Sequence, residues 1–128
     1  MCTDERYQRG MATRREVLGN EHVNRAEASK TAFDAPFQRL ITEMAWGTLW
    51  ASDTLDRPTR SLITIAILAA LGRPEELALH LRATAHTGAT PEQVREALMH
   101  VAVYAGVPAA NSAFALAKRI LAPEPPVE

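Results

Sequence analysis

The sequence contains a single cysteine, Cys2, in its 128 residues. One cysteine cannot form an intramolecular disulfide and has no second thiolate for a metal site. The net charge of −1 lacks the basic excess that a nucleic-acid-binding surface usually shows. The longest apolar run, residues 62–71, is too short to span a bilayer, and the polar N-terminus MCTDERYQRG does not resemble a signal peptide. These absences predict a cytoplasmic protein without nucleic-acid or membrane partners.

Signals for β-strands are also scarce. There is no sustained apolar/polar alternation and no Asn-Gly or Asp-Gly hairpin turn. Start and stop signals for helices are frequent instead, including a capping box at Thr90 to Gln93. They predict a short helical turn at 22–28 and helices at about 7–18, 35–46, 57–71, 74–87, 91–105 and 108–121. The fold class is therefore all-α, with about six helices in one compact domain spanning residues 1–128, with frayed tails at 1–6 and 123–128.

The helix after Asp56 is the most apolar segment of the chain. Its apolar residues surround most of the helix, which is the pattern of a central helix in a bundle. They are Leu62, Ile63, Ile65, Ile67, Leu68 and Leu71. Arg57 and Arg60 lie in its first turn, where the free amides also favour anions. Two arginines there can bind a carboxylate through bidentate hydrogen bonds, and solvated or interface charges are the plainer interpretation.

The next helix carries His80, four residues after Glu76. Residues at this spacing share a helix face, so the Glu76 carboxylate could fix the tautomer of the imidazole and raise its basicity. The alternative is a structural histidine whose hydrogen bonds are satisfied by Glu76 or a backbone carbonyl. No other close pair of potential ligands recurs at a metal-binding spacing, so the sequence predicts no metal site.

Two further groups of residues could line a pocket for a small molecule. Trp46 and Trp50 flank Gly47, and their flat rings could cover a planar ligand or simply bury area in a core. Tyr104 and Asn111 flank the start of the last helix, whose first-turn amides could face an anion. Asn111 has apolar neighbours in the sequence, so we expect it to have a buried hydrogen-bond partner.

Four separated blocks of the sequence resemble one known family. They are RGMATRREVLG (9–19), AWGTLW (45–50), DRPTRSLITIAILAALGRPEELALHLRA (56–83) and YAGVPAANSAFALA (104–117). Between about residues 7 and 121, in order and in spacing, the chain is similar to the γ-carboxymuconolactone decarboxylase family. The resemblance implies a compact helical fold shared with alkylhydroperoxidase D-like proteins, assembly into homo-oligomers such as trimers or hexamers, and a reaction that needs no cofactor.

The resemblance also implies roles for the candidate residues. The family acts on a small lactone with two carboxylates, which gives Arg57 or Arg60 a carboxylate to bind. The segment LHLRA falls at the family's histidine position, so His80 would stabilise the enolate and deliver a proton, with Glu76 orienting it. Trp46 and Trp50 would lie against the departing carboxylate. We assign Tyr104 and Asn111 to substrate binding.

Three other functions are compared with this one. Peroxidase-type relatives carry a CxxC motif where this sequence has Arg73 and Glu76, so a thiol-based peroxidase activity is disfavoured. The run VAVYAGVPAANSAFAL has the look of a helix-turn-helix, but its would-be recognition helix offers alanines where base-reading groups are needed. A third alternative remains open: the chain could be a homologue that keeps the fold and acts on another small carboxylic acid or lactone, or a non-catalytic assembly protein.

Overall fold

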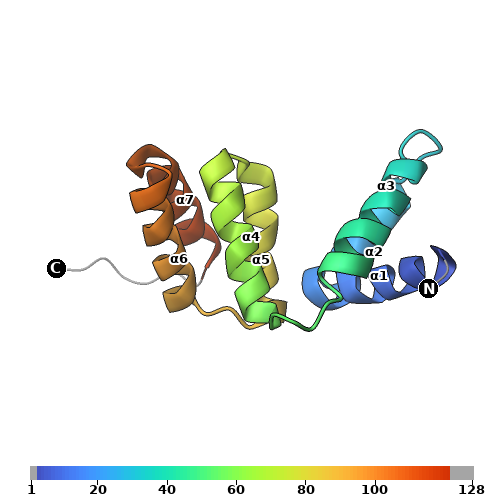
Figure 1. Cartoon of the computed structure of the whole chain (residues 1–128). Coiled ribbons are helices and arrows are strands. Elements are labelled where there is room, and N and C mark those ends of the chain that lie inside the picture. Colours follow the sequence, from blue (N-terminus) through green and yellow to red (C-terminus); the bar gives the residue numbers. More distant parts are fainter. Residues whose placement is uncertain (1–2, 122–128) are drawn as a thin grey trace. The chain divides into compact units, whose positions relative to one another are not determined.

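A computed structural model describes residues 3–121 of the chain, which form seven α-helices, one π-helix and no strand (Figure 1). The all-α prediction is confirmed. The chain divides into two compact units, one ending at Asp56 and the other beginning at Arg57. The expected frayed tail at 1–6 is wrong from Thr3 onward, because Thr3 already begins the first helix. The expected tail at 123–128 lies outside the described residues.

The N-terminal unit contains α1 (Thr3–Leu18), α2 (Asn20–Ser29), α3 (Ala35–Ile41) and the π-helix η1 (Thr42–Leu49). The segment predicted as a short helical turn at 22–28 is a complete helix, α2. Helix α1 packs against both η1 and α2. Asp34 precedes α3, but its carboxylate accepts a hydrogen bond from the Thr31 amide (2.8 Å) instead of capping the helix.

The helix predicted at 35–46 continues instead to Leu49, as η1, so Gly47 does not end it. Its wider winding is visible in the bond from the Trp50 amide to the Ala45 carbonyl oxygen, at 2.8 Å. Gly47 is needed here because α1 passes close to it: a Cβ atom at Gly47 would lie 2.5 Å from the Arg6 carbonyl oxygen. This glycine therefore permits a close helix crossing and does not end the helix.

The C-terminal unit contains α4 (Arg57–Leu71), α5 (Pro74–Thr87), α6 (Pro91–Tyr104) and α7 (Val107–Ile120), all close to the predicted bounds. The capping box at the start of α6 is confirmed: the Gln93 amide donates to Thr90 Oγ1 at 3.1 Å, and the Thr90 amide donates to Gln93 Oε1 at 3.0 Å. At the end of α5, Gly88 adopts a φ of 86°, the left-handed conformation that the predicted C-terminal stop requires.

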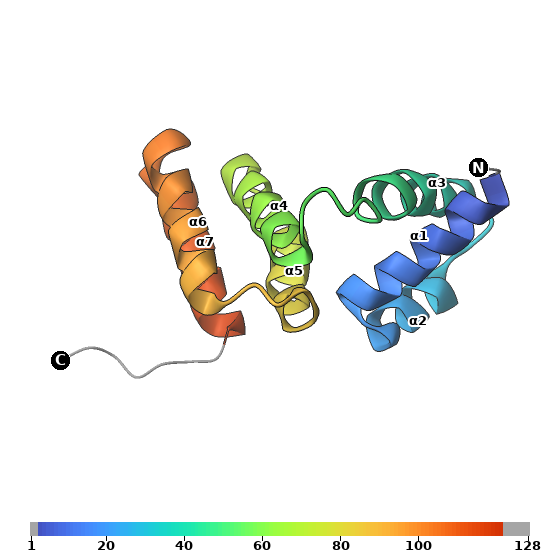
Figure 2. The same ribbon diagram turned by 60° about the horizontal axis from the view of Figure 1, so that its bottom comes forward.

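Helix α4 contacts α5, α6 and α7, as the prediction of a central helix requires. Figure 2 shows α4 beside α5 and α6 beside α7. The shared core is made of Ile65, Ala69, Leu77, Leu81, Val94, Leu98, Val101, Ala110, Ala113 and Ala117. Three of its apolar residues, Ile63, Ile67 and Leu71, are nevertheless exposed on its outer side. At about 100° per residue they point away from the face that carries Ile65 and Ala69.

Among residues 3–121, no helix combines the length and the apolar character that crossing a membrane requires.

Candidate active site

His80 projects from the middle of α5 and is buried, with 7% of its surface exposed. Burial disfavours the charged imidazolium and lowers the pKa of His80 from 6.5 to about 4. The imidazole is therefore neutral at pH 7. A neutral imidazole offers one N–H donor, which can hydrogen-bond to an anion, and one acceptor nitrogen, which can take up a proton.

Glu76 lies one helical turn before His80 and is exposed. Burial is the cause of the lowered pKa of His80, whereas a carboxylate close to the imidazole would raise that pKa. The pKa of His80 therefore gives no sign of a nearby Glu76 carboxylate, and the orienting role of Glu76 stays a prediction.

The two predicted arginines differ in their surroundings. Arg60 is buried, with 7% of its surface exposed, while Arg57 is half-buried at the start of α4. A guanidinium stays charged at any working pH and keeps its flat fork of donors. Arg60 is accordingly the better-desolvated of the two cations, which favours it as the residue that binds a carboxylate.

The N-terminal end of α4 lies beside the C-terminal end of α5. A Cβ atom at Gly88 would be 3.7 Å from Pro58 Cγ, and the two helices are joined at their other ends by the short connection at Gly72 and Arg73. The two helices therefore run antiparallel, and the first turn of α4 is adjacent to the last turns of α5. This register places Arg60 beside the last turns of α5, between one and two turns beyond His80.

A line of buried polar side chains follows from this register, and we call it the polar seam. Its members in the described part of the C-terminal unit are Arg60, Ser61, His80, Thr84 and Thr87. The last three recur at the spacing of one helix face. Sequence reasoning missed Ser61 and Thr87. The signal available was the four- and seven-residue spacing of two threonines after His80.

The hydroxyl groups of the polar seam are not equivalent. Thr84 Oγ1 donates to the Leu81 carbonyl oxygen at 2.7 Å. Ser61 is fully buried, and its Oγ has no hydrogen-bond partner among residues 3–121. A buried hydroxyl without a partner is destabilising, so its presence needs an explanation in function or in a bound solvent molecule.

Trp46 and Trp50 lie close together in the N-terminal unit, as predicted. Their ring centroids are 5.4 Å apart and their planes are inclined by 33°. Both are buried. They are four residues apart, a spacing that places two side chains on nearly the same side of a helix. Their part in substrate binding stays a prediction.

Tyr104 and Asn111 are not part of the polar seam. Tyr104 is 84% exposed at the end of α6, and its ring stacks on that of His100 with centroids 6.0 Å apart. Asn111 is exposed in the first turns of α7, so the expectation of a buried partner is wrong. The buried side of α7 is formed by Ala110, Ala113 and Ala117, and Asn111 points about 100° away from Ala110.

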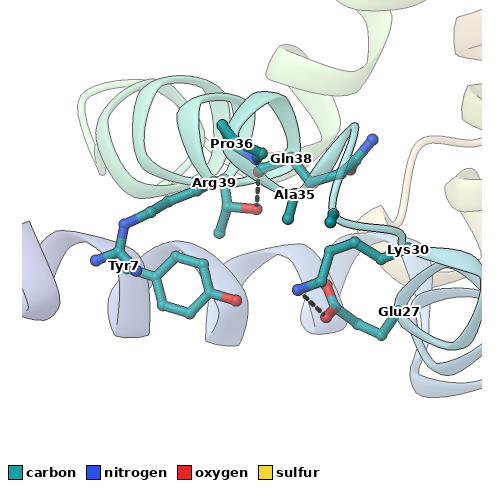
Figure 3. Close-up of a pocket in the computed structure, with 9 residues that line it drawn as sticks. Tyr7, Glu27, Lys30, Ala35, Pro36, Gln38 and Arg39 are labelled. Atoms are coloured by element: carbon teal, nitrogen blue, oxygen red, sulfur yellow. Dashed lines mark hydrogen bonds and ion pairs between the residues drawn. The ribbon is translucent and has the colours of Figure 1, made fainter.

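The N-terminal unit has a cavity of about 460 Å³ between α1, α2 and α3 (Figure 3). The Tyr7 phenol and the Lys30 ammonium group project into it. Its two cations already have carboxylate partners. Lys30 Nζ lies 2.8 Å from Glu27, and the Arg39 guanidinium bonds to Asp4 (3.0 Å) and Glu43 (2.8 Å). These pairs compensate the charge locally, so the cavity is less suited to an anion than the polar seam.

Comparison with known proteins identifies relatives of this chain. Residues 35–119 match the model of the carboxymuconolactone decarboxylase family. The chain is 44% identical to a 4-carboxymuconolactone decarboxylase of Acinetobacter baylyi over 94% of its own length and 90% of that protein. It is 39% identical to a nitrosuccinic acid decarboxylase of Metarhizium robertsii over 90% of its length and 80% of that protein. A 4-carboxymuconolactone decarboxylase sequence of Pseudomonas putida is 44% identical over 37% of this chain and 98% of its own length.

Proposed function

Because the chain belongs to the carboxymuconolactone decarboxylase family, we propose that it converts γ-carboxymuconolactone to β-ketoadipate enol-lactone and carbon dioxide. The similarity to the Acinetobacter baylyi enzyme, over almost the whole of both chains, supports this carboxy-lyase activity. The observation that carries the proposal is the polar seam, which holds a buried cation, Arg60, and a buried neutral imidazole, His80, on two helices packed against each other.

The substrate carries two carboxylates, and they need different treatment. The carboxylate of the acetate arm is retained, so a fixed cation can hold it throughout the reaction. Arg60 is our candidate because it is already desolvated, and Arg57 in the same helical turn is the second. The other carboxylate leaves as neutral carbon dioxide, and an apolar surface favours that loss of charge. Trp46 and Trp50 remain our candidates for that surface, on the basis of the family resemblance.

The chemical step breaks one carbon–carbon bond. As carbon dioxide leaves, its bonding electron pair moves through the ring alkene to the lactone carbonyl and forms a dienolate. A proton then adds to the α carbon and gives the enol-lactone. The conjugated lactone accepts the electrons itself, so no metal or organic cofactor is needed for this step.

His80 is our candidate for the group that meets the enolate. Its neutral imidazole can donate a hydrogen bond to the developing negative charge without the cost of burying an ion. A bound dianion raises the pKa of a nearby imidazole, so the same ring can gain and pass on a proton once substrate is present. Glu76 remains the proposed orienting group, and Tyr104 and Asn111 remain proposed substrate contacts at the protein surface.

The proposal includes the setting of the enzyme. We place it in the cytoplasm, in the breakdown of aromatic compounds through protocatechuate. It would act as a homo-oligomer on a small lactone dicarboxylate, without nucleic-acid or membrane partners. The exposed residues Ile63, Ile67 and Leu71 on α4 are consistent with contact between subunits.

The test is carbon dioxide release from γ-carboxymuconolactone by the purified protein. We expect turnover by the wild type and a loss of at least about a hundredfold in kcat for His80→Ala, within the range for removing a general acid. His86→Ala, at an exposed position on the same helix, is the matched control and should turn over normally. A folded wild-type protein that releases carbon dioxide from nitrosuccinate and not from the lactone would replace this proposal with the alternative substrate.

A further inference from the structure

A second cavity lies in the C-terminal unit, and no residue of the polar seam lines it. It has a volume of about 380 Å³ and lies between the α4–α5 connection and α7. Its floor is apolar and includes Leu68, Leu77, Ala113 and Leu116. We propose that this cavity is a second binding site, for a small carboxylic acid with an apolar body. The proposal does not depend on the decarboxylase activity.

The charges at the rim of this cavity are all of one sign. Arg73 and Arg119 line it together with Ser112, and its lining contains no acidic side chain. Neither guanidinium has an ion-pair or hydrogen-bond partner within residues 3–121. The cavity of the N-terminal unit differs in this respect, because Lys30 and Arg39 are bonded there to carboxylates.

A third cavity, between α4 and α6, provides a second contrast. Its volume is about 340 Å³, and Glu92 and Glu96 line it beside Arg95. Acidic and basic side chains are mixed in that lining, so it carries no excess of positive charge. Of the three cavities, only the one beside Arg73 and Arg119 combines unopposed guanidinium groups with an apolar floor.

The combination of floor and rim defines the chemistry of the ligand. An arginine fork matches the geometry of a carboxylate, and Ser112 adds a hydroxyl that can donate to the same oxygens. An inorganic anion has no apolar surface to bury against this floor. A ligand with a ring or a short aliphatic chain would cover the floor and remove both apolar surfaces from water. A volume near 380 Å³ is at the lower end of the range for small-molecule sites, which favours a single ring over a larger ligand.

Benzoate is a suitable probe, and benzamide has the same shape without the charge. Methyl chemical shifts of the full-length protein would be followed during titration with each compound, using Leu77 and Leu116 as local reporters. We expect benzoate to shift these methyl signals in a saturable way and to raise the melting temperature, because a ligand that binds only the native state stabilises it. Benzamide should bind at least about tenfold more weakly.

Three variants locate the binding. The double variant Arg73→Gln/Arg119→Gln should weaken benzoate binding by at least about tenfold, as should Ser112→Phe, which fills the cavity and keeps both arginines. Arg82→Gln removes an exposed arginine of α5 that does not line the cavity, and it should bind like the wild type. His80→Ala should also bind like the wild type, which separates this site from the polar seam.

Several results would overturn the proposal. One is the absence of benzoate binding to the wild type, and another is equal binding of benzoate and benzamide. Binding that survives both the double arginine variant and Ser112→Phe would place the ligand elsewhere. A change of oligomeric state in the double variant, without any benzoate binding to the wild type, would assign the arginines to an interface between copies instead. None of these outcomes affects the assay of carbon dioxide release from the lactone.

Discussion

Gly10 of α1 lies directly against Gly47 of η1. A Cβ atom on Gly10 would be 3.0 Å from the Gly47 amide nitrogen and would overlap the Thr42 carbonyl oxygen. The two glycines thus let the backbones of α1 and η1 touch. Since Gly47 is the neighbour of Trp46 in the sequence, this helix crossing also fixes the place of the tryptophan pair.

The first prediction concerns this crossing. Gly47→Ala should force α1 and η1 apart and destabilise the protein by roughly 1–3 kcal/mol, the usual cost of inserting an atom where there is no room. The fluorescence of Trp46 and Trp50 should change with it, since both rings are buried. Ala12→Ser adds one atom at an exposed position of α1 and is the control. If Gly47→Ala has the stability and fluorescence of the wild type, the helix crossing has room for an added methyl group and the prediction is wrong.

The second prediction follows from the lowered pKa of His80. The folded protein holds this imidazole neutral down to a pH of about 4, whereas the unfolded chain binds a proton near 6.5. Stability should therefore fall as the pH drops from about 6.5 towards 4, by roughly 3 kcal/mol, because a pKa difference of one corresponds to about 1.4 kcal/mol. Chemical denaturation across this range would measure the loss.

His80→Gln removes the titrating group and supplies the comparison. Its free energy of unfolding should depend less on pH between 6.5 and 4 than that of the wild type. Above pH 7 the two proteins should show the same dependence on pH. Parallel pH profiles of the two proteins would mean that His80 is solvated in the folded state.

The third prediction separates the two hydroxyl groups of the polar seam. Ser61→Ala removes a buried hydroxyl without a partner, so the free energy of unfolding should stay the same or rise by about 1 kcal/mol. Thr84→Val removes a hydroxyl that donates to the Leu81 carbonyl oxygen, and it should destabilise by about the same amount. Urea unfolding of both variants would measure the difference. A clear loss of stability in Ser61→Ala would indicate that its hydroxyl binds an ordered water.

The fourth prediction ranks the two arginines of α4. Arg60→Lys should lower kcat/KM for the lactone by at least about tenfold, because lysine cannot reproduce a bidentate contact with a carboxylate. Arg57→Lys should have a smaller effect, since Arg57 is only half-buried. Steady-state kinetics of both variants would decide, and a larger effect at Arg57 would reverse the assignment of the retained carboxylate.

The helices of the C-terminal unit were predictable because their ends are encoded locally. Gly88 and the capping box at Thr90 act through neighbouring residues, so the sequence alone identifies them. Gly47 was misread because the same residue type ends one helix and permits a close crossing in another. Only the position of α1 distinguishes the two uses, and that position is a tertiary property.

The candidate site was predictable in part for the same reason. The burial of His80 follows from apolar residues spaced around α5, whereas Asn111 has apolar neighbours in the sequence and still faces outward. Neighbours along a helix point in different directions, so sequence proximity does not report surroundings. Ser61 was missed because a serine in a helix gives no sign of its burial until the facing helix is known.

Contacts at both ends of the α4–α5 hairpin hold the two helices in register. At one end the Arg73 amide bonds to the Leu68 carbonyl oxygen at 3.0 Å, and at the other Pro58 lies beside Gly88. Two helices held in this way cannot slide along each other by a turn. The helix positions that carry Arg60 and His80 therefore keep their register, so the site proposed for them would need no rearrangement of the helices before the next substrate molecule binds.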